Sequence, residues 1–193
     1  MWQQMFRGFK MMLVLTVLTG LAYPLVVTGL CQVLFRDQAD GSLIRANGRI
    51  VGSRLIGQNF KGPEYFQPRP SAAGNDGYDP TSSNAFNFGP TNQKLADRVK
   101  DSVAAFRKAN PEYTGPIPAD LVASSASGLD PDISPASADV QAARIASARG
   151  ISVDQLRSLI ARNTQNRDLG FLGEPRVNVL AINLALDASF PKR

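Results

Sequence analysis

The stretch that decides the architecture is "MMLVLTVLTGLAYPLVVTGLCQVLF", an uncharged run from Met11 to Phe35. At a rise of 1.5 Å per residue, a helix of this length reaches roughly 37 Å, whereas the hydrocarbon core of a bilayer is about 30 Å thick. A cleaved signal peptide has a shorter apolar region, and this run continues well beyond its weak cleavage site at Ala22. We therefore predict one uncleaved transmembrane helix over residues 11–35.

The flanks of this run set the expected orientation. Arg7, Lys10 and the terminal amine make the short first flank positive, and short positive flanks stay in the cytoplasm. We therefore place residues 1–10 in the cytoplasm and residues 36–193, as one soluble domain, outside it. Within the run, small and hydroxylated residues favour contact with a neighbouring helix, and Pro24 predicts a kink.

The residue content excludes several classes of function. There is no histidine and one cysteine, Cys31, so His-based catalysis, an intrachain disulfide and a thiolate metal cluster are excluded. The net charge is +5, but the basic residues form no dense patch, so nucleic-acid binding is not expected. The sequence has no G-x-x-x-x-G-K-[ST] loop for phosphate binding. We predict no catalytic residues, no metal site and no tightly bound cofactor.

The region after the apolar run predicts a mixed α+β domain. Residues 62–92 are rich in Gly, Pro, Ser, Asn and Asp, yet they carry aromatic side chains, which indicates an ordered loop that docks on another surface. Apolar residues alternate in the last segment, residues 176–187, and a period of two favours a largely buried strand. A helix beginning at Pro175 is the alternative for this segment.

Three helices are expected to follow favourable cap residues. Thr91 or Asn92 can cap the first of them, and Ser134 followed by a proline can cap a second that runs on to Gly150. Ser152 and Gln155 have the spacing of a capping box for the third.

The stretch "SGLDPDISP", Ser127 to Pro135, places two aspartates one residue apart. A calcium loop starting at Asp130 would need Gly at its sixth position and Glu at its twelfth, and this chain has Pro135 and Gln141 there. The acidic pair could also attract potassium. The favoured interpretation is a turn in which Asp132 lies just before a helix, where a carboxylate is favourable.

Several blocks, in this order, make the chain similar to a known family: "GSRLIGQNF", "RPSAA", "YDP", "GPTN", "SASGLDPDISP", "ARIASARG" and "GFLGEPRVNVLAINLALD". The chain resembles the C subunits of the Kdp potassium-transporting ATPase, a bacterial P-type pump complex, from the apolar run to the C-terminus. It departs from many members at Asp132, where they carry His, and at residues 163–165, where they carry His-Thr-Glu.

This resemblance implies a single-span, non-catalytic accessory subunit of the bacterial inner membrane with a periplasmic domain. Its partners would be the potassium-translocating A subunit, the ATP-hydrolysing B subunit, the small F subunit and the lipid bilayer. The complex would import potassium with high affinity, driven by ATP. One account makes the C subunit a catalytic chaperone that raises the ATP affinity of the B subunit. The other makes it an assembly subunit, scaffold or potassium filter outside the membrane, with no nucleotide contact.

The chaperone account needs a nucleotide contact, which this chain could make only jointly with the catalytic subunit. The "SASG" turn and a downstream glutamine loosely resemble the signature of ABC transporters, and they supply the nucleotide-binding candidates Ser125, Ser127, Gly128 and Gln141. This contact conflicts with a domain outside the cytoplasm.

Candidates for partner contact come from the long loop, because it carries residue types common at interface centres. These candidates are Tyr65, Phe66, Arg69, Phe86, Phe88 and Asn92. The alternative is that they pack on the core of their own domain.

Overall fold

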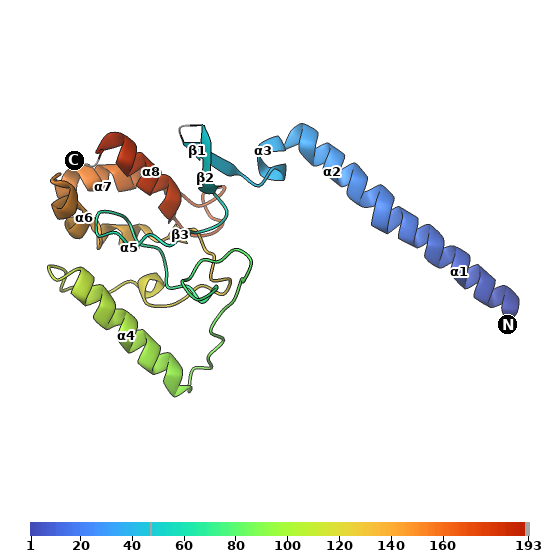
Figure 1. The fold of residues 1–193 in the computed structure, drawn as a ribbon, viewed down its shortest axis with the longest axis horizontal. Coiled ribbons are helices and arrows are strands. Elements are labelled where there is room, and N and C mark those ends of the chain that lie inside the picture. Colours follow the sequence, from blue (N-terminus) through green and yellow to red (C-terminus); the bar gives the residue numbers. More distant parts are fainter. Residues whose placement is uncertain (47, 192–193) are drawn as a thin grey trace. The chain divides into compact units, whose positions relative to one another are not determined.

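The computed structural model describes residues 1–46 and 48–191 and divides the chain into two compact units, Met1–Val51 and Gly52–Arg193 (Figure 1). The first unit contains a long apolar helix and a short helix, followed by most of a β-hairpin. The described part of the second unit contains five α-helices and a small sheet. The protein is therefore α+β with one N-terminal apolar helix, as the sequence predicts.

The long helix extends from Trp2 to Leu34 and is long and apolar enough to cross a membrane, with a mean hydropathy of 2.0 in its most apolar window. α1 (Trp2–Val17) and α2 (Tyr23–Leu34) are joined by a π-helical turn, Leu18–Ala22. Pro24 has no N–H, and its ring crowds the carbonyl four residues earlier, so the widened turn lies where a regular helix would be strained. The helix begins at Trp2, earlier than the predicted Met11.

A short connecting region follows this helix. It consists of α3 (Arg36–Ala39) and a two-stranded hairpin, β1 (Leu43–Ala46) and β2 (Arg49–Ser53). Asp40 accepts a hydrogen bond from the Gln32 amide at 3.1 Å, which ties α3 to the end of α2.

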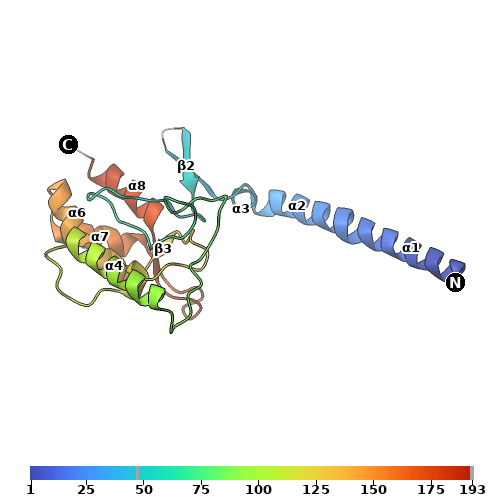
Figure 2. The same ribbon diagram turned by 60° about the horizontal axis from the view of Figure 1, so that its bottom comes forward.

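The second unit is built from helices around a small antiparallel sheet. The helices are α4 (Gln93–Ala109), α5 (Pro135–Asp139), α6 (Ala142–Arg149), α7 (Val153–Asn163) and α8 (Val179–Ser189). The sheet has the order β3-β5-β4, with β3 (Asp132–Ile133), β4 (Thr164–Gln165) and β5 (Arg176–Asn178). In Figures 1 and 2 the long loop, coloured teal to green, runs between the α6–α8 group and α4.

The predicted helix caps are confirmed. Asn92 accepts a hydrogen bond from the Lys94 N–H at the start of α4, and Ser134 accepts one from the third residue of α5, both at 3.0 Å. Ser152 and Gln155 form the reciprocal capping box of α7. Gly150 ends α6 in the left-handed conformation, at a φ of 66° that glycine adopts without steric cost.

The helix predicted to run without a break to Gly150 is divided into α5 and α6. Gln141 lies at the break, and its side-chain amide donates to the Ser137 carbonyl at 3.1 Å. That carbonyl would accept from the Gln141 backbone N–H in a continuous helix, but this N–H bonds to Ala138 instead. The glutamine side chain therefore replaces one backbone bond and ends the first helix.

The strand predicted for residues 176–187 is largely wrong. Only β5 is extended, and α8 begins at Val179 with Asn178 as its cap, which accepts from the Ala181 N–H at 3.0 Å. The helical alternative is confirmed in kind, although the helix begins four residues after Pro175. The segment is so apolar that both a period of two and a period of 3.6 place large side chains on one face.

The core of the second unit lies between α5, α6, α7, α8 and β5. One residue of the long loop joins it: the Phe66 side chain has no exposed surface and packs with these elements. The large apolar side chains with no exposed surface are Phe66, Ile145, Leu156, Val177, Ile182 and Leu186. The long loop is therefore packed into the folded domain through Phe66 and is not a loosely attached surface segment.

Candidate functional site

Two side-chain amides fasten the first part of the long loop to the core. Asn183 of α8 accepts from the Phe66 N–H and donates to the Phe66 carbonyl, both at 2.9 Å. Gln141 does the same for the next residue, accepting from the Gln67 N–H at 2.8 Å and donating to its carbonyl at 3.1 Å. Each amide thus replaces the two hydrogen bonds that a neighbouring strand would supply. We call this pair of side chains the amide clamp.

Two arginines of α6 hold the residues just before the clamp. Arg144 donates to the carbonyls of Pro63 and Tyr65 and to the Gln141 side chain, and burial lowers its pKa to about 10. Arg149 is 3% exposed, donates to the Glu64 carbonyl and pairs with Asp187 at 2.6 Å. The loop backbone is therefore bound by charged donors as well as by amides.

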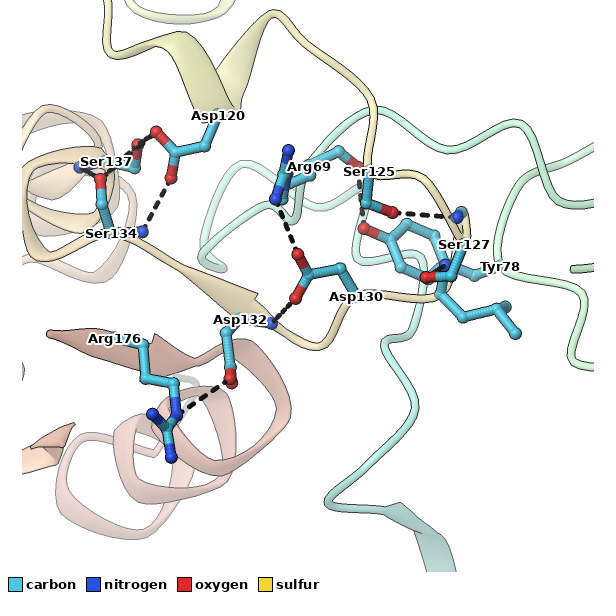
Figure 3. A network of polar contacts seen from close by, with 12 residues as sticks. Arg69, Tyr78, Asp120, Ser125, Ser127, Asp130, Asp132, Ser134, Ser137 and Arg176 are labelled. Carbon is cyan, nitrogen blue, oxygen red and sulfur yellow. Dashed lines mark hydrogen bonds and ion pairs between the residues drawn. The ribbon is translucent and has the colours of Figure 1, made fainter. Parts of the chain in front are cut away.

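A polar network connects the middle of the loop to the stretch around the two aspartates, as Figure 3 shows. The Arg69 guanidinium donates to Asp130 at 2.7 Å, and the Tyr78 hydroxyl donates to the Arg69 carbonyl at 2.8 Å. Burial, followed by the charge of Asp130, raises the pKa of Tyr78. The hydroxyl is therefore a permanent donor at physiological pH, and it holds the loop in place.

The two aspartates have separate roles. Asp130 accepts from the Asp132 N–H at 3.1 Å, which forms the predicted turn. Asp132 forms an ion pair with Arg176 of β5 at 3.4 Å (Figure 3). It also accepts a hydrogen bond from the Asn178 amide at 3.1 Å. Burial is the largest influence on the Asp132 carboxyl and raises its pKa. Each carboxylate thus faces an arginine, and neither points with the other toward a common site.

A third aspartate, which the sequence did not single out, completes the start of α5. Asp120 accepts from the Ser134 N–H at 2.7 Å and from the Ser137 hydroxyl at 2.5 Å (Figure 3). It lies fourteen residues before Ser134 in the sequence, so no local spacing could have revealed it.

The four residues predicted to contact nucleotide are used within the domain. Ser125 accepts from the Gly128 N–H at 2.9 Å, and Ser127 accepts from the Leu129 N–H at 3.1 Å. Gly128 has a φ of 69°, and a Cβ added there would lie 2.6 Å from the Asn84 carbonyl oxygen, so the loop passes too close for any side chain. Gln141 is 1% exposed and belongs to the amide clamp.

A polar cleft of about 470 Å³ lies beside the network, between the loop and the stretch that precedes it. Its walls include Asn59, Lys61, Arg69, Ser71 and Tyr78. The Nε of Arg69 is buried and has no hydrogen-bond partner among the described residues. The cleft thus has charges of both signs in its walls, positive from Lys61 and Arg69 and negative from Asp76.

The network, the clamp and the apolar helix occur together in a chain whose residues 5–188 match the family model described as "KdpC: K+-transporting ATPase, c chain". The chain belongs to this family. It is 56% identical over 192 residues to a protein of Koribacter versatilis (strain Ellin345) named potassium-transporting ATPase KdpC subunit, covering 99% of this chain and 97% of that one. A Rhodospirillum rubrum protein of the same name is 58% identical over 177 residues, covering 92% and 91%. The Geobacter sulfurreducens one is 55% identical over 182 residues, covering 94% and 95%.

The KdpC match confirms the family resemblance drawn from the sequence blocks. Parts of two blocks lie in the domain interior: "ARIASARG" is the α6 segment that carries Arg144 and Arg149, and "NVLAINLALD" is the α8 segment that carries Asn183. Arg144, Arg149 and Asn183 were not predicted as functional residues. The sequence does single out Asn183 in one respect, because it is one polar residue inside a run of apolar ones.

The predicted partner-contact residues of this KdpC chain fall into two groups. Phe66 lies in the core, and the Tyr65 hydroxyl donates to Asp187 at 2.9 Å while its ring lies against Arg149. These two residues therefore follow the alternative interpretation, in which the loop packs on its own domain.

The second group retains exposed surface. Phe86 and Phe88 stack at 5.9 Å, and the Arg98 guanidinium of α4 lies 3.1 Å from the Phe86 ring centroid. Both rings are half-buried against α4, beside a cavity of about 250 Å³. Arg69 is partly exposed, and Asn92 is exposed at the start of α4. These four residues stay candidates for partner contact.

Proposed function

We propose that the chain is a non-catalytic accessory subunit of an ATP-driven potassium import complex, required for the assembly of that complex. Its helix Trp2–Leu34 anchors it in the bacterial inner membrane, with the N-terminus in the cytoplasm and the second unit outside it. Its partners are the A, B and F subunits. The observation that carries this proposal is the family match over residues 5–188, which includes both the apolar helix and the domain.

The paired carboxylates support an assembly role over an ion-binding role. Asp130 is neutralised by Arg69 and Asp132 by Arg176, so the acidic stretch offers no free negative charge to a potassium ion. The groups that hold the loop in one conformation are numerous and buried. A loop held in this way presents a fixed surface, which lowers the entropy lost on binding a partner.

The proposed role includes no nucleotide contact by this chain. Gln141 and the hydroxyls of Ser125 and Ser127 are committed to bonds within the domain, and Gly128 is covered by the backbone of Asn84. A phosphate would have to displace these bonds and the loop that they hold. A role as catalytic chaperone would therefore have to act through the conformation of the partner subunits.

Two measurements test the proposal. A reporter that fluoresces only in the cytoplasm and an enzyme active only in the periplasm, each fused after Arg193, decide the side of the membrane. We expect activity from the periplasmic reporter alone, and fluorescence from the cytoplasmic one would overturn the orientation. Cells lacking this chain should lose both growth at limiting potassium and co-purification of the A and B subunits. Recovery of an intact A–B complex without this chain would overturn the assembly role.

A further inference from the structure

The turn between β4 and β5 exposes a group of large apolar side chains. Leu169 is 83% exposed, Phe171 is 69% exposed and Leu172 is 50% exposed. In the described part of the second unit, one other large apolar side chain is comparably exposed, Leu55 at 62%. We call residues 168–172 the apolar tip. Exposed apolar groups gathered in this way mark interaction sites on soluble domains more often than scattered ones do.

The apolar tip has a defined backbone structure. The Asp168 N–H donates to the Leu172 carbonyl and the Leu172 N–H donates to the Asp168 carbonyl, both at 2.9 Å, so the ends of the tip pair as in a hairpin. Arg167 and Glu174 form an ion pair at 2.7 Å across the base. The base continues into β4 and β5, which are paired with each other, and β5 packs against the core helices. The apolar side chains are therefore presented on a supported turn.

Leu169 occupies a conformation that leucine rarely adopts. Its φ is 54°, in the left-handed region where glycine and asparagine are favoured. A polar residue such as asparagine would fit this solvent-facing position better, because it tolerates the left-handed backbone conformation and its side chain is favourably exposed to water. Such a local conflict at an exposed site indicates that the side chain serves contact with another molecule.

The charges around the tip distinguish between two kinds of occupant. The base carries Arg167 and Arg176 against Asp168 and Glu174, with pairs at 2.7 Å and 4.0 Å, so it has no excess of positive charge. Turns and helices that bind anionic membranes combine exposed apolar groups with surplus Lys or Arg. A neutral polar rim around apolar anchors is the composition of a protein interface.

We propose that the apolar tip docks into an apolar pocket on a protein subunit of the same complex, with Leu169 and Phe171 as the anchors. The inference rests on the proposed function, because it assumes partner subunits, and it assigns a contact surface that lies outside the long loop. The pocket would be rimmed by groups of both charge signs, which complement the Arg167–Glu174 pair.

The first test measures binding of the purified full chain in detergent to A and B subunits that are purified separately and then mixed. Leu169→Asn and Phe171→Ser should each raise the apparent Kd at least tenfold, about 1.4 kcal/mol. Asparagine tolerates the left-handed conformation, so Leu169→Asn should leave the unfolding midpoint of the free chain unchanged or higher. Leu55→Asn is the matched control and should bind as the wild-type chain does.

The outcomes separate this inference from the proposed function. Wild-type binding together with unchanged binding of both tip variants would overturn the tip as a docking surface while leaving the accessory role intact. Absence of binding by the wild-type chain would overturn the proposed function, and the tip proposal with it. A dimer of the free wild-type chain that the tip variants abolish would assign the tip to self-association and also overturn the proposal.

A fluorescent probe tests the membrane as the alternative occupant. Trp2 is the single tryptophan, so a Trp2→Phe, Phe171→Trp chain reports on the tip alone. In nanodiscs without partners its emission should be that of an exposed indole and should resist quenching by brominated lipids. Quenching by brominated lipid would overturn the proposal in favour of a lipid surface.

Discussion

The amide clamp allows a quantitative test of how the long loop is held. Asn183→Leu keeps the size of the side chain but removes both hydrogen bonds to Phe66, each 2.9 Å long and buried. An unsatisfied buried N–H or C=O costs about 1–3 kcal/mol, so the loss of two partners costs about 2–6 kcal/mol. The apolar replacement recovers about 1.5–3 kcal/mol in this core position. We expect a net loss of about 2 kcal/mol in the free energy of unfolding of the second unit.

Urea unfolding of the full chain in detergent, followed by far-ultraviolet circular dichroism, measures this loss. Amide hydrogen exchange gives the local readout, since the Phe66 N–H should exchange much faster once its acceptor is gone. Asn163→Leu is the control, because it removes one bond to the Leu159 carbonyl near the end of α7 and should cost less than about 1 kcal/mol. An Asn183→Leu chain that loses less than about 0.5 kcal/mol and keeps slow exchange at Phe66 would refute the clamp.

Three further predictions test other parts of the second unit. Gly128 and Gly150 have a similar positive φ, so Gly128→Ala and Gly150→Ala carry the same backbone cost, but only Gly128→Ala places a Cβ 2.6 Å from the Asn84 carbonyl oxygen. In thermal unfolding, Gly128→Ala should lose about 3 kcal/mol and Gly150→Ala about 1 kcal/mol. Equal losses would contradict the close approach. Burial raises the pKa of Asp132 in the folded state, so folding takes up a proton and stability from this group grows as pH falls. Asp132→Asn lacks that gain, so its free energy of unfolding relative to that of the wild-type chain should decline as the pH is lowered from 7 to about 4. A difference that does not change with pH would contradict the raised pKa of Asp132. Ser152→Ala should lose about 1 kcal/mol through the capping box, and an unchanged midpoint would show that the cap contributes nothing.

The features that the sequence predicted correctly depend on neighbouring residues. A cap such as Asn92 or Ser152 acts within three residues of itself, and the left-handed Gly150 ends a helix by its own conformation. The apolar helix is likewise recognised from its own length and content. Local chemistry decides all of these features, so one sequence is enough to find them.

The C-terminal segment shows where periodicity fails. Between Val179 and Ser189 nearly every residue is apolar or small, so the apolar pattern cannot distinguish a strand from a helix. The decisive signal was Asn178, a cap residue directly before the run. In such a uniformly apolar segment, a cap residue is a better indicator of a helix than the alternation is of a strand.

The hydrogen bonds that hold the long loop could not be predicted from the sequence, for another reason. Asn183 bonds to a residue 117 positions away, and Arg144 bonds to a carbonyl 81 positions away. Their acceptors are backbone atoms, which every residue has, so no pairing of residue types in the sequence reveals them. A lone Asn within an apolar run indicates a buried partner but does not identify it.

The distance in sequence between Asn183 of the amide clamp and Phe66, the loop residue that it holds, has a consequence for how the protein is made. Phe66 leaves the ribosome long before Asn183, and at about 5–20 residues per second the 117 intervening residues take roughly 6–23 s. During that interval the amide of α8 is missing, and Phe66 lacks the two backbone hydrogen bonds that Asn183 supplies. Completion of the loop surface therefore waits until α8 has been made, and a chain that stops before α8 cannot acquire it.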